Sequence, residues 1–135
     1  MKNQILIGGQ ALRELGSDRY TNDIDYLIND ESSTEAFKTS KEVDYLNANG
    51  NKFFNEIYKI EKNNKIASPQ SLLELKAYAF VQHCQNYNWE KVDSSEYDMK
   101  FLVRKFKLNS VSIVKNFVSN GELFEIEKII KSVKF

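Results

Sequence analysis

A short apolar run at residues 5–7 ends at the glycine pair Gly8-Gly9. An apolar run stopped by glycines predicts a buried strand that enters a tight turn. Residues 11–15 have the composition of a short helix, and Gly16 is a suitable residue to end it. The beginning of the chain therefore predicts a strand, a glycine turn and a helix, and favours a fold that mixes strands with helices.

Two further strands are indicated before residue 50. Residues 23–28 start with alternating polar and apolar side chains and then become apolar, as in a strand whose first half faces a wet site. Residues 29–33 have the composition of a turn, and residues 43–46 that of another short strand. We expect a helix at 53–58 and a last, edge-like strand at 58–61.

The second half of the chain has helical patterns. Ser68 is a suitable N-cap and Pro69 a suitable first helical residue, and apolar side chains recur at helical spacing as far as His83. Three more helices are predicted at residues 96–106, 110–118 and 123–133, with a break at 120–121.

The length of 135 residues predicts a single domain. We expect residues 1–65 to form a half that contains a small mixed β-sheet, and residues 66–135 to form a helical half, in an α/β (α+β) architecture. Nineteen basic and nineteen acidic side chains give a net charge of zero. No global field therefore draws the chain to nucleic acid or to an anionic membrane.

The sequence also indicates the subcellular location of the protein. Cys84 is the only cysteine, so an internal disulfide is impossible and a reducing compartment fits. The glycine pair interrupts the first apolar run too early for a signal peptide. No apolar run approaches the roughly 20 residues that span a bilayer. We expect a cytoplasmic protein with no membrane segment.

Three carboxylates are predicted to lie close together. Asp23 and Asp25 are two residues apart, so on a strand both side chains project from one face. Asp44 lies on a second predicted strand, and neighbouring strands would bring all three together. Clustered carboxylates repel, and a divalent cation removes the conflict, with Mg²⁺ or Mn²⁺ suited to oxygen ligands. Alternatives stay open: Asp23 and Asp25 as solvent-facing residues of an edge strand, and Asp44 as a surface residue with Glu42 as the third ligand.

The glycine pair complements these carboxylates. Glycines between a strand and a helix let the backbone approach a ligand closely, with amide groups facing a phosphate. A simple tight turn is the alternative explanation of Gly8-Gly9. The pair His83-Cys84 falls short of a zinc site, and packing is the favoured explanation of both side chains.

The motifs together resemble a known superfamily. Residues 7–12 (Ile-Gly-Gly-Gln-Ala-Leu) and 19–25 (Arg-Tyr-Thr-Asn-Asp-Ile-Asp) resemble the signature of the nucleotidyltransferases. The resemblance is closest to small bacterial proteins related to abortive-infection (AbiE-type) nucleotidyltransferase toxins. It implies the nucleotidyltransferase fold. The residues that it implies as metal ligands are Asp23, Asp25 and Asp44, and those that it implies as phosphate contacts are Gly8 and Gly9.

Three further residues are candidates for nucleotide binding. Residues 68–76 are similar to the family's Ser-Pro-x-x-Leu-x-x-x-Lys helix, which implies that Lys76 faces the nucleotide. A lysine within an apolar stripe either extends to solvent or meets an anion. Arg19 is a candidate phosphate ligand or a structural clamp, and Thr21 binds nucleotide or only shapes the loop before the strand.

The resemblance implies a Mg²⁺-dependent transfer of a nucleoside monophosphate from an NTP, such as ATP, to an RNA, protein or small-molecule acceptor. An antitoxin or another protein partner is then expected. The alternative is a non-catalytic member of the fold that binds a nucleotide or a partner. Gln10, where many relatives carry Ser or Thr, and Ser94-Ser95, where relatives often carry Lys-Asp, favour this alternative.

Overall fold

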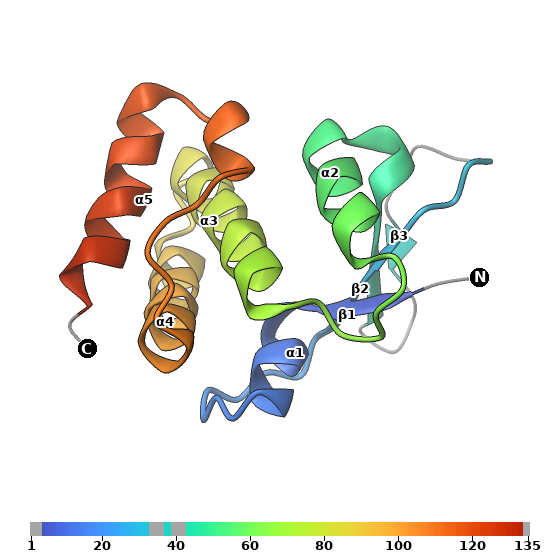
Figure 1. Cartoon of the computed structure of the whole chain (residues 1–135), viewed down its shortest axis with the longest axis horizontal. Helices are drawn as coiled ribbons and strands as arrows, with labels where there is room; N and C mark the ends of the chain where they lie inside the picture. Colours follow the sequence, from blue (N-terminus) through green and yellow to red (C-terminus); the bar gives the residue numbers. More distant parts are fainter. Residues whose placement is uncertain (1–3, 33–36, 39–42, 134–135) are drawn as a thin grey trace. The chain divides into compact units, whose positions relative to one another are not determined.

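The structure, a computed structural model, describes residues 4–32, 37–38 and 43–133. The chain is a mixed α+β protein that divides into two compact units, Met1–Ser68 and Pro69–Phe135 (Figure 1). We call them the sheet unit and the helical unit. Within the described parts of the chain, no helix is long and apolar enough to cross a membrane.

The sheet unit has a four-stranded mixed sheet in the order β1-β2-β4-β3. Strand β1 is antiparallel to β2, β2 is parallel to β4, and β3 is antiparallel to β4. Its elements are β1 (Ile5–Ile7), α1 (Gly8–Glu14), β2 (Ile24–Ile28), β3 (Phe37–Lys38), β4 (Val43–Asn47), a 3₁₀ turn η1 (Ala48–Gly50) and α2 (Lys52–Glu61). The small mixed sheet and the strands expected near residues 5–7, 23–28 and 43–46 are confirmed.

The outer edge of β1 is covered by the segment that follows α2. The Leu6 N–H donates to the Lys65 carbonyl oxygen at 2.8 Å, and the Ala67 N–H donates to the Leu6 carbonyl oxygen at 3.1 Å. Leu6 and Ile66 thereby form a parallel bridge. These bonds satisfy backbone groups of β1 that an open sheet edge would leave to solvent.

Helix α2 is longer than the sequence predicted. The edge strand expected at 58–61 is wrong, because these residues form the last turn of α2. Phe53, Ile57 and Glu61 are spaced four residues apart and all are buried, so one helical face continues to Glu61. The helix begins where the Asn51 side chain accepts a hydrogen bond from the Phe54 N–H at 3.0 Å.

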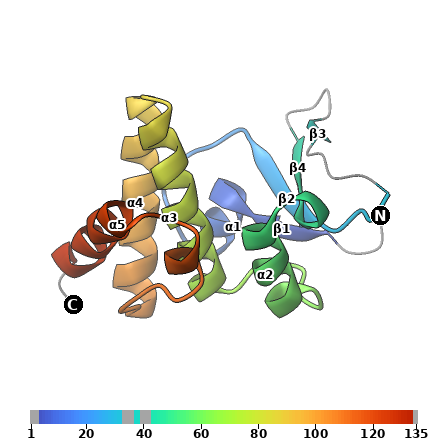
Figure 2. The same ribbon diagram turned by 90° about the horizontal axis from the view of Figure 1, so that it is seen from above.

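The helical unit consists of α3 (Pro69–Gln85), α4 (Trp89–Phe106), a 3₁₀ turn η2 (Val114–Asn116) and α5 (Asn120–Ser132). Helices α3 and α4 pack along each other, as Figure 2 shows from above. Fully buried side chains from all three helices form the core, among them Leu72, Leu73, Met99, Leu102 and Ile126. Burial of these apolar side chains is the main stabilising term of the unit.

Two helix starts differ from the prediction. Helix α4 begins at Trp89 rather than at residue 96, and its first turn is capped by the Asn88 side chain, which accepts from the Lys91 N–H. Residues 120–121 do not break a helix, because they are the first residues of α5. Ser119 and Glu122 form a capping box there, which satisfies two backbone donors at the helix start.

The helix expected at 110–118 is wrong, and a buried carboxylate explains why. Glu74 of α3 is fully buried. Its carboxylate accepts backbone hydrogen bonds from Ser112 at 2.8 Å, Ile113 at 3.1 Å and Val114 at 2.9 Å. Three consecutive N–H groups that converge on one side chain favour the irregular path and the short η2 turn over a regular α-helix.

We predict that Glu74→Ala lowers the free energy of unfolding by about 3 kcal/mol, because three backbone donors lose their acceptor. Urea denaturation followed by circular dichroism measures the change. Glu125→Ala, at an exposed surface ion pair, is the matched control and should change stability by less than about 0.5 kcal/mol. Equal stabilities of the two variants would show that Glu74 does not anchor this segment.

Candidate functional site

The glycine pair is in contact with the motif that follows it. Gly8 has φ +71°, in the left-handed region that favours glycine. A Cβ atom at Gly8 would overlap Oδ2 of Asp25. A Cβ atom at Gly9 would lie 2.6 Å from Cγ2 of Thr21 and 3.2 Å from a guanidinium nitrogen of Arg19. The structure thus brings together five of the predicted site residues, and only glycine fits at the turn.

Two of the three predicted metal ligands lie on neighbouring strands. Asp25 of β2 is the register partner of Ile7 in β1 and of Asp44 in β4. Register partners on adjacent strands project from the same face of a sheet, so Asp25 and Asp44 share one face. Both are half-buried. This is the carboxylate pair that the sequence placed on two strands.

Asp23 has a different setting. It precedes the first residue of β2, and its backbone N–H donates to Oγ1 of Thr21 at 3.2 Å. Among the residues that the structure describes, no three His, Cys, Asp or Glu side chains are grouped closely enough to hold a metal ion. Glu42, the alternative third ligand, lies outside the described residues. The described carboxylates therefore form a pair, Asp25 and Asp44, with Asp23 at its margin.

Side chains of α1 fix the loop that carries Arg19 and Thr21. Nε2 of Gln10 donates to the Thr21 carbonyl oxygen at 2.9 Å, and a guanidinium nitrogen of Arg13 donates to the Arg19 carbonyl oxygen at 3.2 Å. The Arg13 guanidinium also lies over the Tyr20 ring, 5.9 Å from its centroid. In the sequence, Gln10 stands out only as a departure from the family pattern. Its long amide side chain positions the loop before β2.

Lys76 lies in the helical unit, where it pairs with an acid. Its Nζ is 2.9 Å from Oδ2 of Asp98, and the two side chains are 16% and 1% exposed. A lysine in an apolar stripe was expected to reach solvent or an anion, and the anion that it contacts is Asp98. Removing one partner of such a buried pair leaves the other charge uncompensated.

Cys84 does not have the environment of a reactive thiol, and His83 beside it is a partly buried imidazole. Burial, with the charges of Lys91 and Lys76, lowers the pKa of His83. Burial, with the charges of Glu125 and Glu122, raises the pKa of the Cys84 thiol. A thiol with a raised pKa is protonated at neutral pH and is a poor nucleophile or metal ligand.

No family model matches the chain, and comparison with curated proteins and with solved structures gives no match either.

We predict that Gly8→Ala lowers the free energy of unfolding by about 2 kcal/mol, because it combines a positive φ with overlap against the Asp25 carboxylate. Gly121→Ala is the matched control, since its Cβ would meet nothing within 4 Å in helix α5. That control should stabilise the protein by up to about 1 kcal/mol. Equal destabilisation by both substitutions would contradict the packing of Gly8 against Asp25.

We also predict a pH dependence that comes from the single histidine. Because the folded-state pKa of His83 is lowered, the unfolded chain binds the proton more readily, so stability is lost as pH falls through 6.5 toward the folded pKa. Thermal unfolding measured from pH 7.5 to pH 5.5 should show this loss, and His83→Gln should flatten it. An unchanged pH profile in His83→Gln would contradict it.

Proposed function

We propose that the chain is a Mg²⁺-dependent nucleotidyltransferase, which transfers a nucleoside monophosphate from an NTP to an acceptor and releases pyrophosphate. The observation that supports this most is the register pairing of Asp25 with Asp44 on one sheet face, with Asp25 against the glycine turn. The order of strand, glycine turn, helix and Asp-bearing strand also supports a nucleotidyltransferase fold.

The residues present fit a magnesium ion. Mg²⁺ is commonly bound by one or two carboxylates together with substrate phosphates rather than by a complete protein cage. Asp25 and Asp44 provide two carboxylates on one face, and Asp23 is the third candidate at the margin. When bound, Mg²⁺ would neutralise phosphate charge and polarise the phosphoryl group.

The remaining site residues have distinct roles in this proposal. Gly8 and Gly9 form the turn to which the phosphates are assigned, and their lack of side chains lets Asp25, Arg19 and Thr21 lie against it. Arg19, whose guanidinium lies beside Gly9, would donate charge-assisted hydrogen bonds to those phosphates. Thr21 shapes the approach, since its methyl group contacts the same glycine and its Oγ1 accepts the Asp23 N–H.

In the reaction, a hydroxyl oxygen of the acceptor bonds to the α-phosphorus of the NTP. The bond from the α-phosphorus to the bridging oxygen breaks, pyrophosphate leaves with the bonding electron pair, and the hydroxyl proton passes to water. The acceptor is an RNA, a protein side chain or a small molecule. Such a nucleotidyl transfer is accelerated by positioning of the reactants and by stabilisation of the developing charge, and no covalent enzyme intermediate is required.

A non-catalytic protein that binds a nucleotide or a protein partner, such as an antitoxin, is the second candidate. The ion pair of Lys76 with Asp98 favours it, because a lysine assigned to the nucleotide already has an anionic partner within its unit. Gln10 favours it as well, since its side chain serves the loop before β2.

We predict that one NTP raises the thermal unfolding temperature only when Mg²⁺ is present. A ligand at about 100 times its Kd adds roughly 2.7 kcal/mol of stability, which is a readily measured shift. Asp25→Asn should abolish the ligand-induced shift, and Asp93→Asn, at an exposed position of α4, should keep it.

Each outcome has a defined meaning. A Mg²⁺-dependent shift with release of pyrophosphate in the presence of an acceptor supports the enzyme. A shift without any turnover, across RNA, protein and small-molecule acceptors, favours the non-catalytic binder. A folded protein whose unfolding temperature responds to no NTP contradicts both forms of nucleotide binding at the Asp25–Asp44 face.

A further inference from the structure

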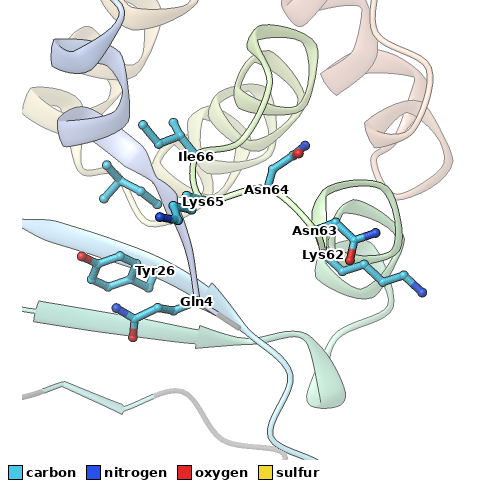
Figure 3. Close-up of a pocket in the computed structure, with 8 residues that line it drawn as sticks. Gln4, Tyr26, Lys62, Asn63, Asn64, Lys65 and Ile66 are labelled. Atoms are coloured by element: carbon cyan, nitrogen blue, oxygen red, sulfur yellow. The ribbon is translucent and has the colours of Figure 1, made fainter. Parts of the chain in front are cut away.

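The sheet unit has a cavity of about 530 Å³ between the sheet and the segment that follows α2. We call it the lysine groove. Gln4, Leu6 and Tyr26 line it from the strands, and residues 62–66 line it from the connecting segment (Figure 3). Tyr26 follows Asp25 directly in β2, so the two side chains project from opposite faces of the sheet. The groove is therefore separate from the Asp25–Asp44 face.

The polar lining of the groove favours an anion. It contains two ammonium groups, Lys62 and Lys65, and the side-chain amides of Gln4 and Asn63, with no carboxylate. Asn64 also lines the groove, but its amide nitrogen donates to Glu61. Both lysines are exposed, and neither forms an ion pair with any residue that the structure describes. A chain with zero net charge thus has a locally positive groove.

The nearest acid along the chain does not neutralise the groove. Glu61 is 1% exposed, and its carboxylate accepts hydrogen bonds from Nδ2 of Asn64 at 2.9 Å, from the Ser68 N–H at 3.0 Å and from Oγ of Ser68 at 2.7 Å. These donors surround the carboxylate inside the unit. Glu61 therefore acts as an internal anchor for the lysine-bearing segment and leaves the two ammonium groups to solvent.

The segment is also held before any ligand binds. The Asn64 N–H donates to the Glu61 carbonyl oxygen at 2.8 Å, and Lys65 and Ala67 exchange backbone hydrogen bonds with Leu6. Both ends of the segment are thus fixed, one to α2 and the other to β1. A preformed segment pays less ordering entropy on binding than a mobile loop would.

An aromatic wall completes the groove. The ring of Tyr26 stacks on the ring of Tyr45 from β4, with centroids 5.8 Å apart and planes 22° apart. This neighbour holds the Tyr26 ring in place, and Figure 3 shows the ring beside Gln4 and Lys65. An aromatic wall next to an ammonium group matches a ligand that joins a planar ring to a phosphate.

We propose that the lysine groove binds a nucleoside phosphate unit, with the base against Tyr26 and its phosphate at Lys65 (Figure 3). Lys62, which extends away from Tyr26, meets a neighbouring phosphate when the ligand is a strand. A free nucleotide and a single-stranded nucleic acid both offer this chemistry. The site does not depend on the carboxylate pair or on Mg²⁺, which makes its test independent of the proposed nucleotidyltransferase activity.

The test uses the full chain in EDTA, so that no divalent cation contributes. Fluorescence anisotropy measures binding of a labelled single-stranded hexaribonucleotide, with AMP and UMP as competitors. Lys62→Gln/Lys65→Gln should weaken binding on the order of tenfold or more and make the salt dependence of log K shallower by about 1.4, since each single-strand phosphate contact contributes about 0.7. Lys91→Gln/Lys115→Gln, which removes two exposed lysines from the helical unit, is the matched control and should bind as the wild type does.

Further variants and probes separate the outcomes. Tyr26→Leu should lose affinity for the oligonucleotide, with folding verified by circular dichroism, while Asp25→Asn should keep it. If AMP or UMP competes with the oligonucleotide, a free nucleotide is sufficient to occupy the groove. If the oligonucleotide binds and neither nucleotide competes, the ligand is a single-stranded nucleic acid. The proposal is overturned by wild-type affinity in Lys62→Gln/Lys65→Gln, by no binding of either probe, or by equal binding of a polyglutamate peptide.

Discussion

The close approach of the glycine turn to β2 is the constraint on which the candidate site depends. Because Gly8 has no Cβ, the start of α1 can lie directly against the Asp25 carboxylate. Because Gly9 has no Cβ, the Thr21 side chain can likewise lie against the turn. Since β2 pairs with β4 in parallel register, fixing Asp25 also fixes Asp44 beside it. One steric condition at the end of β1 therefore positions residues from three separate segments of the chain.

Two buried glutamates organise the connections in an analogous way. Glu61 in the sheet unit accepts donors from Asn64 and Ser68, and Glu74 in the helical unit accepts three consecutive backbone N–H groups. A buried carboxylate is tolerated only when donors surround it. Each of these side chains therefore specifies the path of a segment that has little regular structure of its own.

What the sequence predicted and what it missed follow from the range of the interactions. Alternation at residues 23–28 and the glycines after residue 7 are local signals, and they led to β2 and to the turn. Phe53 and Ile57 gave a local signal for helix α2. The helix continues to Glu61, whose charged side chain is buried, although a charged residue in a sequence is normally expected at the surface. The path of residues 112–114 depends on Glu74, which is 38 to 40 residues away in the chain.

The candidate site also combines short-range and long-range interactions. The proximity of Asp25 and Asp44 was predictable, because each lies on a segment with a local strand pattern and short strands close in sequence often pair. The roles of Gln10 and Arg13 were not predictable. Long polar side chains on a helix are expected to face solvent unless the position of the loop that they contact is known. Their contacts explain why a short α1 holds the Arg19–Thr21 loop against the glycines.

The zero net charge of the chain conceals a local sorting of charge. Because side chains alternate along β2, Asp25 projects from one face of the sheet and Tyr26 from the other. The carboxylates of Asp25 and Asp44 thus lie on the first face. Lys62 and Lys65, from the segment that follows α2, line the groove on the side of Tyr26. A sheet between them keeps the two sets from neutralising one another by direct pairing. The placement of charge around the sheet, rather than its sum over the chain, therefore sets the local charge on each side of the sheet unit.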